Sequence, residues 1–241
     1  LRALSLINLL MKYADDTNLL VPCNTDVQID AEFDNIQTWA VANKMTINVA
    51  KTKEIVFRRP SARCTTVLPP MLPCIERVKS AKLFGVFITD NLKFGDHVNY
   101  VLQRSCQRLY LLKLLRCQGL SLHNLSIVCV ALLISRLTYA ISAWGGFCSA
   151  SDVGRINSFL KRVVKYGFLT EFSDFNSYLD QADLKLFKRM CHSDHCLHML
   201  LPALKPTVCQ KLRRRTHVYT LPKYRYELFK KSFVLRCLYN F

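Results

Sequence analysis

The sequence is short of acidic residues. Its 17 aspartates and glutamates stand against 34 lysines and arginines, which gives the 241-residue chain a formal net charge of +17 at pH 7. Solubility does not require so large an excess, and a surplus of this size is typical of proteins that bind a polyanion. We therefore expect a nucleic acid as the partner, with an anionic membrane surface as the alternative.

Long hydrophobic runs are lacking too. The most apolar stretch is IVCVALLI at 127–134, with Arg136 close behind it, whereas a bilayer span needs about 20 apolar residues. We expect neither a transmembrane helix nor a membrane partner. A disulfide framework is not expected either, because the eleven cysteines are odd in number, scattered inside apolar runs and preceded by no secretory leader. They indicate reduced thiols and a nuclear or cytoplasmic location.

A short stretch near the start, LLMKYADDTNLLVP at 9–22, carries two adjacent carboxylates between apolar runs. The pattern predicts two buried strands joined by a tight turn, with Asp15, Asp16, Thr17 and Asn18 in the turn. Neighbouring acids repel each other, so a turn tolerates them where they lie in water or bind cations. The pair alone is compatible with either a solvated turn or a cation site.

Helix, strand and turn signals alternate over the next seventy residues. Apolar residues at steps of three and four predict a helix over 26–45. MTINVAKTKEIVF at 45–57 predicts an extended segment, a short loop and a strand, and four prolines make 58–73 a connection. KLFGVFIT at 82–89 predicts a strand with a bulge or a close backbone approach at Gly85.

Three helices are predicted beyond this strand. The second runs from a cap at Ser121 to about Tyr139 and the third from about Ser151 to Tyr166. The first has one apolar face, formed by Val98, Leu102, Ser105, Leu109 and Leu112. Residues 205–241 then carry ten lysines and arginines against the single acid Glu227, interleaved with the aromatic residues Tyr219, Tyr224, Tyr226 and Phe229.

The YADD motif at 13–16, set between two apolar strands, resembles the catalytic hairpin of reverse transcriptases. The order of the motifs after it resembles the non-LTR (LINE-type) retrotransposon enzymes in particular. WAVANKMTINVAKTKEIVF is similar to a palm segment in which a helix leads into an Asn-x-x-Lys-Thr turn, here Asn48, Lys51 and Thr52. KLFGVFITDNLKFGDHV resembles the hairpin that holds the primer end, LTYAISAW the thumb, and LPKYRYELFKKSFVLRCLYNF the close of such reading frames.

This resemblance implies an α+β fold and an RNA-directed DNA polymerase. A partial right-hand palm, made of a catalytic β-hairpin, a helix and strands, would span 1–95. An α-helical thumb would span 96–167 and a basic, mostly helical tail 168–241. The complete enzyme would use Mg²⁺ (or Mn²⁺) in two-metal nucleotidyl transfer, with deoxynucleoside triphosphates, an RNA template and a DNA primer.

The resemblance also assigns roles to individual residues. Asp15 would be the direct metal ligand, Asp16 the second carboxylate, and Tyr13 would lie beside the primer terminus, which Phe84 and Gly85 also contact. Lys51 would give a proton or positive charge to the leaving pyrophosphate; its alternative is a solvated loop lysine.

One family element has no counterpart in the 241 residues. The other metal-binding aspartate and the fingers lie upstream of YADD in this family, so the chain has the character of a fragment, and we expect it to be inactive by itself. Uncovered hairpin faces would also lower its solubility. The alternatives are a non-catalytic nucleic-acid-binding protein derived from such an element, or a decayed relic. The sequence leaves the oligomeric state open.

Cations on the helices and in the tail are the expected nucleic-acid contacts. A thumb grips the backbone of a duplex, which suits Arg104, Arg108, Lys161, Arg162 and Lys165; each has a solvated surface as its alternative. In KLRRRTHVY, the cations and nearby tyrosines suit phosphate contact and stacking, although a nuclear-localisation signal has the same composition. These tail cations are Lys211, Arg213, Arg214 and Arg215.

CHSDHCLH at 191–198 contains three residue types that bind zinc. The candidate ligands are Cys191, Cys196, His198 and Cys209, but their spacing matches no standard knuckle or finger. We therefore expect structural packing here and no zinc site.

Overall fold

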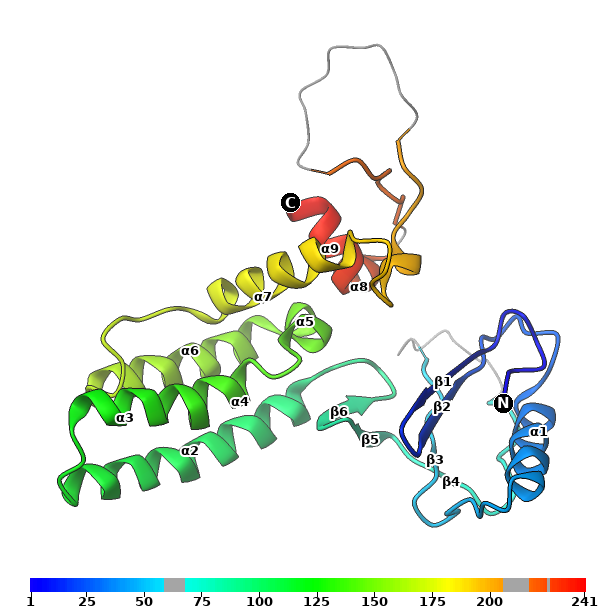
Figure 1. Cartoon of the computed structure of the whole chain (residues 1–241), viewed down its shortest axis with the longest axis horizontal. Helices are drawn as coiled ribbons and strands as arrows, with labels where there is room; N and C mark the ends of the chain where they lie inside the picture. Colours follow the sequence, from blue (N-terminus) through cyan, green and yellow to red (C-terminus); the bar gives the residue numbers. More distant parts are fainter. Residues whose placement is uncertain (59–67, 206–216, 225) are drawn as a thin grey trace. The chain divides into compact units, whose positions relative to one another are not determined.

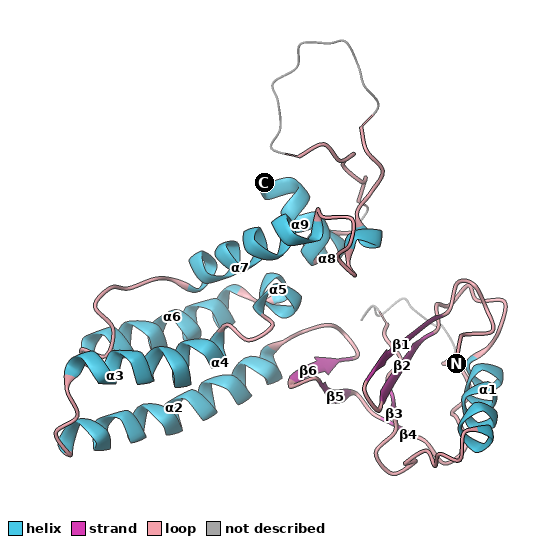
Figure 2. Ribbon diagram, viewed as in Figure 1, coloured by secondary structure: helices cyan, strands magenta, loops and turns pink. Residues whose placement is uncertain are grey.

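The computed structural model describes residues 1–58, 68–205, 217–224 and 226–241. The chain forms two compact units: one is Leu1–Ala81 with Thr89–Asn91, and the other is Lys82–Ile88 with Leu92–Phe241. The named strands all lie before residue 90, and every helix but one begins after it (Figures 1 and 2). The chain therefore changes unit within 81–92, close to the palm boundary expected at 95, whereas the expected thumb and tail belong to one unit.

The first unit opens with an antiparallel hairpin of β1 (Leu9–Tyr13) and β2 (Asp16–Leu20). The predicted hairpin is present, but its turn is shorter than expected. Tyr13 pairs with Asp16 across the ladder, so that the turn consists of Ala14, at a φ of 53°, and Asp15. Asp16 and the two residues after it are strand residues, because pairing the two apolar runs along their whole length leaves only two residues for the turn. The prediction that both strands are buried was wrong, since most of their side chains are exposed.

Helix α1 (Ile29–Ala42) is shorter at both ends than the predicted 26–45. Its N-cap is Gln28, and the Asp26 carboxylate does not cap the helix but accepts a hydrogen bond from the Ser5 hydroxyl. It ends in a Schellman motif, in which the Met45 amide donates to the Ala40 carbonyl at 2.8 Å and Lys44 takes a φ of 55°.

Glu32 of α1 ties the N-terminal segment to the helix. It is fully buried, and its carboxylate accepts hydrogen bonds from the Leu4 and Ser5 amides and from the Asn8 side chain at 2.9–3.0 Å. Burial raises the pKa of Glu32, but these hydrogen bonds outweigh it and hold the pKa below its ordinary value. The Ser5 hydroxyl, followed by backbone amides, likewise lowers the pKa of Asp26.

Acid is therefore expected to release residues 1–8 from α1. Both carboxyl pKa values are lower in the folded state, so the stabilisation is present above the unfolded values of 4.5 and 3.8 and is lost as the pH falls through the folded ones. NMR shifts of the Leu4 and Ser5 amide protons should follow this release below pH 4.5. Glu32→Gln should release the segment already at neutral pH, whereas Asp34→Asn, on the exposed side of α1, should leave the titration unchanged.

The remainder of the first unit is built from turns and two short strands. The predicted turn at Asn48 is present: its side-chain oxygen accepts from the Lys51 amide at 3.1 Å, and its carbonyl accepts from the Thr52 amide and hydroxyl. β3 (Lys53–Glu54) pairs in parallel with β4 (Glu76–Arg77). Arg77 donates to both carboxylate oxygens of the buried Glu54 at 2.9 Å and to the Pro69 and Pro70 carbonyls.

The hairpin of β5 (Ser80–Leu83) and β6 (Val86–Thr89) replaces the single interrupted strand expected at 82–89. Phe84 and Gly85 form its two-residue turn, with φ values of 45° and 86°. Positive φ at both central positions matches the twist of a two-residue hairpin, which favours glycine. Gly85 thus marks a chain reversal and no bulge.

The second unit is mostly helical, and its described residues form a main core and a smaller C-terminal core. α2 (Gly95–Cys117) buries four of the five predicted residues, Val98, Ser105, Leu109 and Leu112, whereas Leu102 is only partly buried; His97 and Val101 are buried in addition. α6 (Ala150–Lys165) starts at a Ser149–Asp152 capping box, one residue before its predicted start. Both helices end in glycine Schellman motifs, at Gly119 and Gly167, which turn Leu120 and the fully buried Phe168 back toward the core.

The predicted second helix is present with its Ser121 cap but is not regular. It consists of α3 (Leu122–Cys129), the π-helical turn η1 (Val130–Ile134) and α4 (Ser135–Leu137); α5 (Ile141–Trp144) and the 3₁₀ turn η2 (Gly145–Phe147) follow. The stretch Leu122–Phe147 has 26 residues and contains an 18-residue window with a mean hydropathy of 1.9, so it is long and apolar enough to cross a membrane by length and composition. The apolar run at 127–134, from which no transmembrane helix was expected, covers only part of this longer apolar stretch. A core helix of a globular protein satisfies the same criterion, and this stretch buries Leu125, Cys129, Leu133, Leu137, Ile141 and Trp144.

The C-terminal elements close the second unit. They are α7 (Phe175–Met190), the 3₁₀ turn η3 (His198–Leu200), α8 (Glu227–Lys230) and α9 (Phe233–Asn240). Fully buried Asp183 of α7 binds Arg236 of α9 through two contacts of 2.6 and 3.0 Å. Tyr219 packs into a small core with Phe187, Cys237 and Leu238, so it is not available for stacking on nucleic acid.

Candidate functional site

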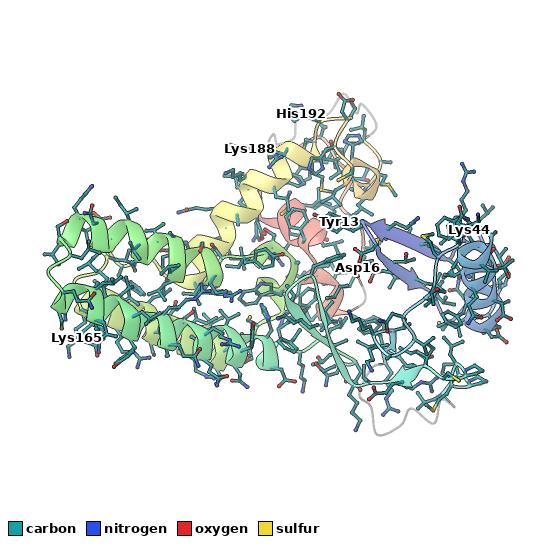
Figure 3. The ribbon with its side chains drawn as sticks, turned by 60° about the horizontal axis from the view of Figure 1, so that its bottom comes forward. Tyr13, Asp16, Lys44, Lys165, Lys188 and His192 are labelled. Carbon is teal, nitrogen blue, oxygen red and sulfur yellow. The ribbon has the colours of Figure 1, made fainter. Side chains whose placement is uncertain are left out.

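The β1–β2 hairpin has one covered and one open face. Side chains alternate along a strand, so Lys12 belongs to the covered face, where its ammonium lies 4.4 Å from the centre of the Trp39 ring of α1. Tyr13 and its cross-strand partner Asp16 belong to the other face and lie side by side at the turn end of the hairpin (Figure 3). On this face Tyr13 is 70% exposed, and Met11 and Leu20 are 44% and 43% exposed.

Asp15 lies in the turn itself, next to Asp16. Both carboxylates are exposed, and no ion pair within residues 1–58, 68–205, 217–224 and 226–241 involves either. Magnesium prefers oxygen ligands and keeps several waters, so two such carboxylates suit part of the ligand shell of one ion. In the described part of the chain no group of three His, Cys, Asp or Glu side chains is placed to hold a metal. A two-metal centre therefore needs a further ligand.

Lys51 lies just after the Asn48 turn, and its side chain is exposed. Its backbone amide donates to the Asn48 side-chain oxygen. Among the described residues, no hydrogen bond or ion pair joins its ammonium to Asp15 or Asp16. The structure is thus compatible with the pyrophosphate role and with its alternative, a solvated loop lysine.

The turn of the β5–β6 hairpin is held against the helical unit by Tyr139. The Tyr139 hydroxyl donates to the Phe84 carbonyl at 3.0 Å. A Cβ atom at Gly85 would lie 3.3 Å from Tyr139 Cε1, closer than most side chains approach. Phe84 and Gly85 are therefore positioned by Tyr139, which lies in the predicted thumb and was not among the predicted site residues.

The five predicted thumb cations differ in how they are engaged. Arg108 donates to the Leu132 carbonyl at 2.8 Å, one of the carbonyls in the π-helical turn η1, and so has a structural partner. Arg104, Lys161 and Lys165 are exposed, and Figure 3 shows Lys165 at the end of α6. Arg162 lies over the Phe159 ring and, with Arg155, lines a groove of about 530 Å³ beside the small residues Ser151, Gly154 and Ser158.

Two further cations of α2, which were not predicted, make contacts with Tyr166 inside the helical unit. Lys113 lies 3.8 Å from the centre of the Tyr166 ring, and Arg116 donates to the Tyr166 carbonyl at 2.8 Å. Both contacts join residues more than forty positions apart, and no local spacing signals them.

Part of the predicted tail site lies outside the described residues. This holds for Lys211, Arg213, Arg214 and Arg215, and for Cys209 of the zinc candidate. Within the described part, the His198 ring contacts the Met190 carbonyl at 3.0 Å, and the His195 ring accepts from the Leu197 amide. These histidines thus make local packing contacts.

No protein-family model matches the chain, and no curated protein or solved structure matches it either.

Proposed function

We propose that this chain is the palm hairpin, thumb and tail of a non-LTR retrotransposon reverse transcriptase, an RNA-directed DNA polymerase that copies an RNA template from a DNA primer. The observation that carries the proposal is the open face of the β1–β2 hairpin. Asp16 and Tyr13 share this face and Asp15 sits at its tip, whereas on the opposite face Lys12 contacts the Trp39 ring of α1. Such a face leaves room for a primer end beside two carboxylates.

Each of the predicted site residues would have a separate role in nucleotidyl transfer. Asp15 and Asp16 would supply oxygen ligands for magnesium or manganese, which activates a primer hydroxyl and neutralises triphosphate charge when bound. Tyr13 would contact the primer terminus from the same face as Asp16. Lys51 would stabilise the leaving pyrophosphate, and the Phe84–Gly85 turn would hold the primer strand.

The test is primer extension. The product of the whole reading frame of the transcript should extend a DNA primer on an RNA template with deoxynucleoside triphosphates and magnesium. The 241-residue chain alone should not, because two adjacent carboxylates do not complete a two-metal site. Failure of the longer product, or extension by the chain alone, would contradict this proposal.

A second candidate is a nucleic-acid-binding protein without catalysis, derived from such an element. The net charge of +17 and the exposed cations of α2 and α6 favour it. This candidate requires that substitution of Asp15 and Asp16 leave the nucleic-acid affinity unchanged. It also requires that the reading frame of the transcript encode neither the upstream metal-binding aspartate nor the fingers.

Both candidates predict that Arg104, Lys161 and Lys165 bind phosphates. Replacing all three by glutamine should weaken duplex binding and lower the slope of log K against log salt by about 0.9 for each phosphate that is no longer neutralised. Fluorescence anisotropy at several salt concentrations measures this slope. A matched triple variant of α7, at Lys185, Lys188 and Arg189, removes the same charge from exposed positions and should change the slope less. Equal weakening by the two variants would show that binding is not confined to the thumb face.

A further inference from the structure

A pocket of about 320 Å³ lies between the β5–β6 hairpin and helices α2 and α4, inside the second unit. Its walls are basic and aromatic, and the principal side chains are those of Lys82, His97, Tyr100, Arg136 and Tyr139. Phe84 and Gly85, which the proposed function places at the primer strand, also line the pocket. No role has yet been proposed for the basic and aromatic side chains Lys82, His97, Tyr100, Arg136 and Tyr139. Its volume is at the lower end of the range of small-molecule sites, about 300–1,000 Å³.

Positive charge gathers around Tyr100. The Lys82 ammonium donates to the Tyr100 hydroxyl at 3.3 Å, and Arg104 lies 5.7 Å from the centre of the same ring. The Lys82 hydrogen bond, the charge of Lys82, a hydrogen bond from Arg104 and the charge of Arg136 together lower the pKa of Tyr100. No ion pair among the described residues includes any of these three cations. Clustered cations without a carboxylate repel one another unless an anion joins them.

Arg136 supplies the second observation. Its Nε atom is buried and has no hydrogen-bond partner in the described part of the chain. A buried donor without a partner is costly, and a guanidinium that lines a pocket is a strong ligand for phosphate oxygens. Arg136 thus lines a pocket with clustered cations and keeps one donor without a partner among the described residues.

His97 does not add charge to this site. It packs edge-on against Trp144, and its Nδ1 accepts from the Phe87 amide at 3.4 Å. Burial first, and the charge of Lys82 second, lower the pKa of His97 to about 4, so the ring is neutral near pH 7. Recognition of an anion therefore depends on Lys82 and Arg136, with Arg104 at a longer distance.

We propose that this pocket binds the phosphate group of a nucleotide, with Arg136 and Lys82 donating to its oxygens. The pocket exceeds the size of a bare phosphate and leaves room for the attached sugar. The nucleotide part of the proposal rests on the proposed nucleic-acid function, whereas the phosphate part stands on the pocket alone. A nucleic-acid strand and a free nucleotide present the same group, so the experiment separates them.

Calorimetric titration of the full chain with inorganic phosphate, at constant ionic strength in chloride, tests the site. Arg136→Gln and Lys82→Gln should each weaken phosphate binding by about tenfold or more. Arg155→Gln is the matched control: it removes one charge from the same unit, where Arg155 is bound to Asp152 and Asn99, and it should stay within about twofold of wild type. Lys82 is exposed, so its variant remains informative even where Arg136→Gln fails to fold.

Competition identifies the source of the phosphate. Displacement by a mononucleotide at lower concentration than by a ten-nucleotide single strand indicates a free nucleotide, and the reverse order indicates a strand. Absent phosphate binding, or equal weakening by Arg155→Gln, would overturn the site. Phosphate binding that neither competitor displaces would overturn its assignment to nucleotides. Primer extension tests the polymerase proposal and the phosphate titration tests the pocket, so a negative result in one experiment does not decide the other.

Discussion

If the chain is part of a reverse transcriptase as proposed, replacing Asp15 by alanine is expected to reduce primer extension by the complete product by at least about a hundredfold. A metal held by this carboxylate is worth several kcal/mol of transition-state stabilisation, and each 1.36 kcal/mol of barrier is about tenfold in rate. Asp15 lies in an exposed two-residue turn, so the substitution removes no core contact. The measurement is the single-turnover extension rate in magnesium at fixed, saturating primer-template.

Two comparisons make this loss specific. Asp30→Ala removes an exposed carboxylate from α1 in the same unit and should leave extension within about twofold. Asp16→Ala tests the second carboxylate, which shares its face with Tyr13. Binding of primer-template should survive in all three variants. If Asp15→Ala extended primers normally, the metal role of the hairpin would be wrong.

Removing the carboxylate of Asp183 is expected to destabilise the helical unit by about 3–5 kcal/mol. Asp183 is fully buried and binds Arg236 through Nε and Nη2. Arg236 also donates to the Ser142 carbonyl at 2.9 Å and to the Lys231 carbonyl at 2.6 Å, so this guanidinium of α9 contacts α5, α7 and the C-terminal end of α8. Asp183→Ala would leave this guanidinium buried without its counter-charge.

Urea unfolding followed by circular dichroism measures the change in the free energy of unfolding. Glu76→Ala is the control, because it breaks the exposed Lys53–Glu76 pair, which should cost no more than about 1 kcal/mol. The double variant Asp183→Leu with Arg236→Met removes both charges and should be destabilised less than Asp183→Ala alone. A destabilisation below about 1 kcal/mol for Asp183→Ala would contradict the buried-pair interpretation.

The contacts of Arg236 also explain why glycine occupies position 146. A Cβ atom there would lie 1.8 Å from Arg236 Nη1 and 2.7 Å from the Lys231 carbonyl oxygen. The backbone of η2 therefore approaches the guanidinium more closely than any side chain permits. This requirement arises from a residue 90 positions away, and the sequence around Gly146 contains no sign of it.

Elements whose signals are local were predicted well. The Ser121 cap, the Asn48 turn and the buried stripes of α2 and α6 all depend on residues within four positions of one another. The two hairpins were predicted less well. Gly85 was interpreted as a bulge because one glycine inside an apolar run is typical of both a bulge and a turn, and only the pairing of β5 with β6 separates them.

Side-chain roles show the same division. Glu32, in the first turn of α1, is buried under the N-terminal segment. Arg108 and Tyr219 were assigned to nucleic acid, yet they serve the π-helical turn and the small C-terminal core. Each of these partners lies at least 18 positions away in the chain, beyond any periodicity.

The sequence by itself determined the helices, their caps, the basic charge and the adjacent carboxylates of YADD, because these depend on composition and on neighbours a few residues apart. Only the tertiary structure decided which face of the β1–β2 hairpin is open, which cations are free for phosphate, and that Lys82 and Arg136 line one pocket. Exposure and charge clustering are set by packing between segments that are distant in the sequence, and local sequence patterns do not show which of these segments meet.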